Sequence, residues 1–86
     1  MEQTVRVETA TNPDVLARVT MLLGRGNLSI VAMRAERKGK HFYMRLTLTA
    51  ESANQLKRFV SQAAKLIDVY DVTPCSEKNG LLEASN

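Results

Sequence analysis

Residues 4–23, TVRVETATNPDVLARVTMLL, decide the fold, because a strand pattern passes into a helix pattern within one short segment. Residues 4–9 alternate polar and apolar side chains, which is the signature of a strand with one buried face. From residue 13 onward, apolar side chains recur at i, i+3 and i+7, as in an amphipathic helix of about three turns. The strand is predicted to bury Val5 and Val7, and the helix Val15, Leu16, Val19, Leu22 and Leu23.

The ends of this helix are marked by residues with specific backbone preferences. Asn12 is a favourable N-cap, and Pro13 suits the first helical position because its missing N–H has no partner there. Asp14 follows, where a negative charge favours the positive end of the helix dipole. Residues 24–27, GRGN, tolerate left-handed backbone and are predicted to end the helix.

A charged hairpin separates two further predicted strands. Residues 28–37 are β-rich, but the parity of their apolar side chains shifts. This shift indicates either a bulge near Val31 or Ala32 or a strand buried on both faces. Residues 36–40 form the hairpin. Residues 41–50 alternate most regularly, so this strand is predicted to have one wet or partner-facing side.

A second helix and a fourth strand complete the pattern. Residues 52–55, SANQ, form a capping box, in which the serine hydroxyl and the glutamine side chain satisfy free backbone donors. The apolar spacing that follows predicts a helix to about Lys65. Residues 67–73 are again β-rich, and Pro74 either ends this strand or lies where a ladder hydrogen bond is dispensable.

The order of these elements predicts an α+β fold, a ferredoxin-like βαββαβ sandwich with a four-stranded antiparallel sheet and two helices on one face. Residues 1–75 form this domain, and residues 76–86 are predicted to be a flexible polar tail. The extra apolar residues of the second strand indicate a partner surface, and we expect a homodimer. The uncovered sheet face is lined by Thr4, Arg6, Glu8, Tyr43, Arg45 and Thr47.

Composition excludes several classes of protein. The 86 residues are 44% apolar and 24% charged, with no apolar run near the ~20 residues of a membrane span. The N-terminus lacks a signal-peptide pattern, so we expect a cytoplasmic protein without membrane binding. A net charge of +3 from scattered side chains is weak support for nucleic-acid binding. One cysteine, Cys75, and one histidine, His41, exclude an intramolecular disulfide and a cysteine zinc cluster, and we predict no metal site.

No arrangement of residues predicts catalysis. Nucleophile-elbow, zinc-protease and P-loop patterns do not occur. We expect His41 at a strand entry in solvent and Cys75 as a small buried residue. The same element order occurs in RNA-binding RRM domains, but residues 38–45, KGKHFYMR, match only the first part of their third-strand pattern. Since Phe42 falls on the core side, we predict neither a catalytic residue nor a nucleic-acid partner.

Three segments carry a resemblance to a known family. They are residues 12–19, NPDVLARV, residues 22–30, LLGRGNLSI, and residues 65–72, KLIDVYDV. Together they resemble the ACT domain of acetolactate synthase (acetohydroxyacid synthase) small regulatory subunits of the short, single-ACT kind. The resemblance implies a non-catalytic regulatory subunit that supports the thiamine-diphosphate-dependent large subunit in valine, leucine and isoleucine biosynthesis.

The resemblance also implies where cofactors and effectors bind. Thiamine diphosphate, Mg and FAD would belong to the large subunit, so no cofactor is expected in this chain. The large subunit is the implied partner, together with a second copy of this chain through the ACT domains. The implied effector-binding residues are Asn12, Pro13, Asp14, Val15, Leu16, Asn27, Leu28, Ser29 and Ile30.

Two departures from the family pattern bear on effector binding. Effector-sensitive members carry a glycine where this chain has Asp14, whose carboxylate would repel the carboxylate of an amino acid. Asn27 and Leu28 replace a glycine and an aromatic residue, which is a milder change because asparagine also adopts left-handed backbone. We therefore expect weak or absent feedback by valine. The alternative is a free-standing ACT-domain module that binds an amino acid without a dedicated enzyme.

Overall fold

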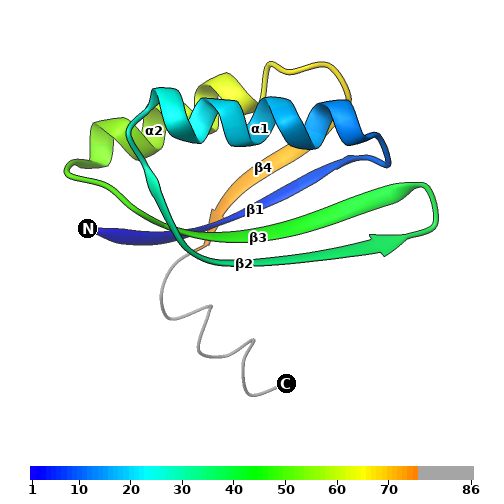
Figure 1. Cartoon of the computed structure of the whole chain (residues 1–86), viewed down its shortest axis with the longest axis horizontal. Helices are drawn as coiled ribbons and strands as arrows, with labels where there is room; N and C mark the ends of the chain where they lie inside the picture. The colour runs from blue at the N-terminus through cyan, green and yellow to red at the C-terminus, as the bar shows by residue number, and fades with distance from the viewer. Residues whose placement is uncertain (76–86) are drawn as a thin grey trace.

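The computed structural model describes residues 1–75 and shows a four-stranded antiparallel sheet covered on one face by two helices (Figure 1). The predicted α+β ferredoxin-like fold is confirmed. The predicted tail, residues 76–86, lies outside the described residues. In chain order the elements are β1 (Glu2–Ala10), α1 (Pro13–Arg25), β2 (Ser29–Lys38), β3 (His41–Thr49), α2 (Ala53–Ala63) and β4 (Val69–Cys75).

The core lies between the two helices and the inner sheet face. The strand order is β2-β3-β1-β4, so β3 and β1 are central and β2 and β4 are edges. Central strands have neighbours on both sides and helices above them, which explains why they carry most of the buried apolar side chains of the sheet. The core includes Val5, Val7, Val19, Leu23, Met44, Leu46, Leu48, Leu56, Phe59 and Ala63.

The predicted start of α1 is confirmed, and its predicted end is corrected. Asn12 is the N-cap, and Pro13 lies in the first turn. The helix continues through Gly24 to Arg25, although the prediction placed these residues in the terminating segment. The left-handed residue that turns the chain is Asn27, with φ of 59°, whereas the C-cap Gly26 keeps right-handed backbone.

The bulge predicted in β2 is confirmed. The register with β3 shifts between Ile30 and Ala32, which leaves Val31 as the extra residue. The alternative, a strand buried on both faces, is wrong because all ten residues of β2 are exposed. The strands extend into the predicted hairpin as far as Lys38, so the turn is shorter than residues 36–40.

The elements near the end of the domain are shorter than predicted. α2 ends at Ala63, since the next amides form tighter turns, such as Leu66 N to Ala63 O at 3.1 Å. β4 begins at Val69 because Asp68 has left-handed backbone, with φ of 71°. Pro74 lies within β4, which is an edge strand and tolerates a missing ladder donor.

Candidate functional site

The first half of the predicted effector site is the loop between β1 and α1. The Asp14 amide donates a 2.9 Å hydrogen bond to Asn12 Oδ1, and Asn12 Nδ2 lies 3.5 Å from Asp68 Oδ2. The Asp68 carbonyl also accepts a 2.8 Å hydrogen bond from the Ala10 amide. Asp14 is exposed at the helix start, where its charge lies beside the amides that an anionic ligand would approach.

Sequence reasoning missed the contribution of Asp68 to this loop. It follows Ile67, which was predicted to begin the last strand but is exposed and lies outside it. The available signal was the residue type, because aspartate is among the few residues that adopt left-handed backbone. That conformation turns the chain so that both the backbone and the side chain of Asp68 face the β1–α1 loop.

The second half of the predicted site connects α1 to β2. Leu28 is buried, and its amide donates a 3.0 Å hydrogen bond to the Leu23 carbonyl at the helix end. Gln55 Nε2 donates to the Gly26 carbonyl at 3.1 Å, which ties this turn to the start of α2. Ser29 and Ile30 are exposed on β2.

A single chain does not bring these two halves together. They lie at opposite ends of α1, whose 13 residues span about 20 Å (Figure 1). Val15 and Leu28 are buried, and Leu16 packs against the core, so these three side chains do not form an open pocket. Within one chain, a ligand the size of an amino acid therefore cannot touch both halves.

An apolar edge runs along β2. Ile30, Val31 and Met33 are 45%, 55% and 51% exposed, and we call these residues the β2 apolar edge. Large apolar side chains on an unpaired edge strand indicate a protein contact. The parity shift in the sequence indicated this surface. Met21 on α1 is also exposed, and it was missed because it falls outside the predicted apolar stripe.

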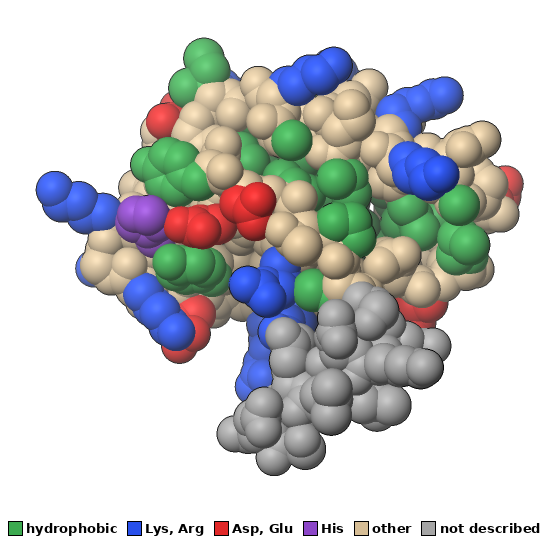
Figure 2. Space-filling model, turned by 180° about the vertical axis from the view of Figure 1, so that it is seen from behind, with side chains coloured by type: hydrophobic (Ala, Val, Ile, Leu, Met, Phe, Trp, Pro, Cys, Tyr) green, Lys and Arg blue, Asp and Glu red, His purple; other side chains and the backbone are tan. Residues whose placement is uncertain are grey.

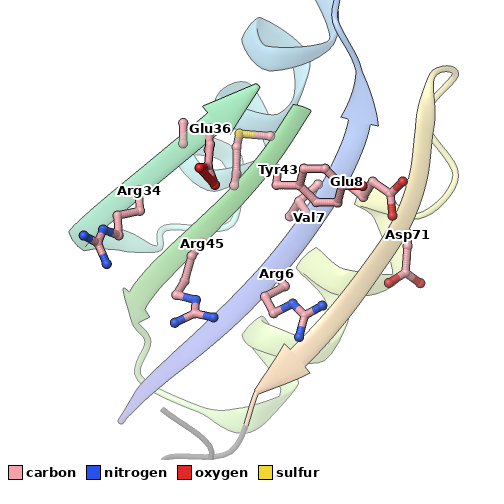
Figure 3. Close-up of a pocket in the computed structure, with 10 residues that line it drawn as sticks. Arg6, Val7, Glu8, Arg34, Glu36, Tyr43, Arg45 and Asp71 are labelled. Atoms are coloured by element: carbon pink, nitrogen blue, oxygen red, sulfur yellow. The ribbon is translucent and has the colours of Figure 1, made fainter. Parts of the chain in front are cut away.

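The predicted uncovered sheet face is confirmed as a second open surface. Charged residues and Tyr43 from all four strands line a concavity of about 550 Å³ on the side away from the helices (Figure 3). We call this surface the outer sheet face. Its charged and aromatic members are Arg6, Glu8, Arg34, Glu36, Tyr43, Arg45 and Asp71.

His41 lies at the entry of β3, as predicted, but it contacts an acidic side chain. Its Nδ1 is hydrogen bonded to Glu8 Oε2, and its ring lies 5.1 Å from the Tyr70 ring between centroids. Figure 2 shows the histidine beside acidic side chains. Strand pairing brings this partner across from β1, which local sequence does not reveal. Cys75 is buried, in agreement with the prediction.

This architecture defines the class of protein: a small βαββαβ module with one helix-covered face and two open surfaces, the β2 apolar edge and the outer sheet face. A family model of the ACT domain matches residues 11–72, and the chain belongs to this family. ACT domains are regulatory, non-catalytic domains that commonly form dimers.

Solved structures share the fold at low sequence identity. The ACT domain of a GTP pyrophosphokinase from Chlorobium tepidum has a TM-score of 0.78 and 13% identity, over 87% of this chain and 97% of that one. An ACT domain protein from Streptococcus pneumoniae has a TM-score of 0.73 and 13% identity, over 93% of each chain.

An acetolactate synthase small subunit from Thermotoga maritima has a TM-score of 0.75 and 20% identity. The match covers 90% of this chain but 48% of that protein, so the chain spans about half of its length. No curated protein matches the chain in a sequence comparison.

The side chains and helices of residues 1–75 also bear on metal binding and membrane insertion. Within this range, no three His, Cys, Asp or Glu side chains are grouped so that they could hold a metal ion. Neither helix in the described part of the chain is long and apolar enough to cross a membrane.

Proposed function

We propose that the chain is the non-catalytic regulatory small subunit of an acetolactate synthase. It would bind the large subunit, which holds thiamine diphosphate, Mg and FAD, and raise its activity in branched-chain amino-acid biosynthesis. Membership of the ACT family supports a regulatory role. The choice of enzyme is supported by the resemblance of residues 12–19, 22–30 and 65–72 to short small subunits, and by the small-subunit neighbour of similar fold.

The observation that carries a regulatory role is the division of the effector site between the two ends of α1. Ala10 and Lys38 both pair with His41, so the start of α1 lies at the end of β2. Suppose that β2 pairs antiparallel with β2 of a second copy. The start of β2 in the second copy then lies at the end of the sheet where α1 begins in the first copy. This homodimer covers the β2 apolar edge and joins Asn12–Asp14 of one chain to Asn27–Ile30 of the other.

The same arrangement would make feedback by valine weak. The ligand carboxylate would approach the amides at the start of α1, where the exposed Asp14 places a carboxylate and a Cβ. Like charges disfavour one another at short distance, so Asp14 lowers the affinity for an amino acid. A subunit with this residue supports its enzyme without strong inhibition by valine.

Co-purification from the native host tests the proposed partner. The tagged chain is expected to retain a large chain that makes acetolactate when supplied with thiamine diphosphate, Mg and FAD. A chain that retains no such activity, although it is folded and expressed at native levels, contradicts the proposal.

The second candidate is a free-standing ACT module that senses an amino acid. It is favoured by the same divided effector site, because that site needs only a homodimer. Calorimetry with valine, leucine and isoleucine separates the two functions. Micromolar binding of one of them by the isolated chain supports the sensor, whereas weak or absent binding supports the enzyme subunit.

A further inference from the structure

The outer sheet face carries its charges in two rows that run across the strands. Arg34 is paired with Arg45, and Arg45 with Arg6, so three guanidinium groups lie on neighbouring strands. The second row lies two residues farther along the same strands. In it, Tyr43 of β3 lies between Glu36 of β2 and Glu8 of β1. Glu8 is in turn paired with Asp71 of β4. Figure 3 shows the arginines side by side and the acidic side chains farther along the same face.

This arrangement is costly for an isolated chain. Like charges that lie directly opposite one another on neighbouring strands destabilise a sheet by tenths of a kcal/mol per pair. The fold does not need these side chains in its core, because all of them lie on the side away from the helices. Acidic and basic residues two positions apart on one strand, about 7 Å, offset part of the repulsion.

The two rows are complementary to each other, strand by strand. A twofold axis that runs across the strands between the rows places a second copy face to face with the first. The same axis places the arginine row of one copy over the acidic row of the other. Each strand then faces the same strand of the second copy. Arg34 then faces Glu36 of the second copy, and Arg6 faces its Glu8. Arg45 faces the ring of Tyr43, which suits a guanidinium group.

From this self-complementary register, we propose that the outer sheet face binds the outer sheet face of a second copy of this chain. The contact is separate from the β2 apolar edge and does not depend on the proposed enzyme. Arg6 and Arg45 already take part in interactions within the chain, Glu8 is hydrogen bonded to His41, and Glu36 lies 3.7 Å from Lys38. Association therefore exchanges these interactions for contacts with the second copy. Aligned packing of two sheets at about 10 Å leaves room for such long side chains.

The size of the face indicates a weak contact dominated by charge. Four strands of about nine residues cover roughly 600 Å² per copy, or about 1,200 Å² in total, which is the lower end of specific interfaces. Exposed ion pairs contribute little each and are screened by salt. The association is therefore expected at high protein concentration and low ionic strength, and it is expected to weaken steeply as salt is added.

Two charge-reversed variants test the proposal. The double variant R6E/R34E makes the face acidic, and E8R/E36R makes it basic. The variants are studied alone and as an equimolar mixture by sedimentation velocity at low salt, with circular dichroism as the test of folding. R37E is the matched control, because Arg37 lies on β2 opposite Phe42, one residue out of phase with the charged rows.

The wild-type chain and R37E are expected to show an association step that is lost near 0.5 M salt. Each double variant alone is expected to lose this step, and the mixture is expected to regain it. A mixture no heavier than its components overturns the proposal, as does equal loss in R37E.

If a reversed variant does not fold, the neutral variant R34Q/E36Q is measured instead, and unchanged association then overturns the proposal. Saturable binding of inorganic phosphate by the wild-type chain, without any salt-sensitive association, assigns the arginine row to an anion and also overturns it.

Discussion

β2 and β3 lie side by side in the sheet, but their apolar side chains have opposite roles. β3 buries Met44, Leu46 and Leu48 beneath the helices, whereas all ten residues of β2 are exposed. The register pairs Met33 with Leu46 and Ala35 with Met44, so buried and exposed apolar groups are direct neighbours. Position in the sheet makes this difference: β3 is central and β2 is an edge. Apolar groups on β3 stabilise the fold, and those on β2 are available to a partner.

The strongest effect is expected for Met44→Ala. Met44 is 2% exposed, so truncation loses transfer free energy and leaves a cavity. We expect the free energy of unfolding to fall by about 2–5 kcal/mol. Urea unfolding followed by circular dichroism measures the change. A loss below about 1 kcal/mol would show that β3 is not the central support of the core.

A smaller loss of stability is expected for Gln55→Ala, which removes the side chain that ties the start of α2 to the turn between α1 and β2. Gln55 Oε1 accepts hydrogen bonds from the amides of Glu51 at 2.7 Å and Ser52 at 3.1 Å, and its Nε2 reaches Gly26. Loss of this cap is expected to cost about 1 kcal/mol in the same unfolding assay. Gln62→Ala, at an exposed position in the last turn of α2, is the matched control and is expected to change little.

Asp14→Gly addresses the proposed effector half-site, which β2 of a second copy would complete. Loss of the charge at the helix start is expected to lower stability by about 0.3–1 kcal/mol. The affinity for valine is expected to rise, as measured by calorimetry. Asp14→Asn removes the charge but keeps the Cβ, so it separates repulsion from bulk. If Asp14→Gly stays folded and binds valine no better than the wild type, Asp14 acts only as a helix-start residue.

The smallest effect on folding is expected for Met33→Ala, the counterpart of Met44→Ala. At concentrations where the chain is monomeric, this exposed side chain is expected to contribute less than about 0.5 kcal/mol to unfolding. Met33→Asp, by contrast, is expected to raise the dissociation constant of the proposed dimer through β2 at least ~10-fold, a difference of about 1.4 kcal/mol. Sedimentation equilibrium measures this constant, and an unchanged value would show that β2 is not the dimer edge.

The sequence predicted the element order because its signals are local. Alternation in residues 41–50, the cap at Asn12 and the box at residues 52–55 each depend on neighbours within a few residues. The parity shift also indicated a bulge near Val31 or Ala32 as one of two explanations, and the structure has the bulge at Val31. Segment ends were less accurate, because Gly24 was counted as a terminator although it is accommodated within the helix.

The candidate sites were less predictable because they depend on contacts distant in sequence. Asp68 reaches Asn12 across 56 positions, and Glu8 reaches His41 across 33. The charged rows likewise emerge only when the register between strands is known. The residues that the family resemblance implied for an effector lie at both ends of α1, as the helix pattern of the sequence predicts. Which surface would join the two ends depends on contacts that no local pattern reveals.

In the proposed function, this chain activates a catalytic partner without catalysing a reaction itself. The most direct measurement is the rate of acetolactate formation by the large subunit from the same organism, with and without the purified chain. The rate is expected to rise several-fold and to saturate at a fixed molar ratio, and the isolated chain is expected to form no acetolactate. A rate that stays the same at every ratio, with both proteins folded, would contradict the account.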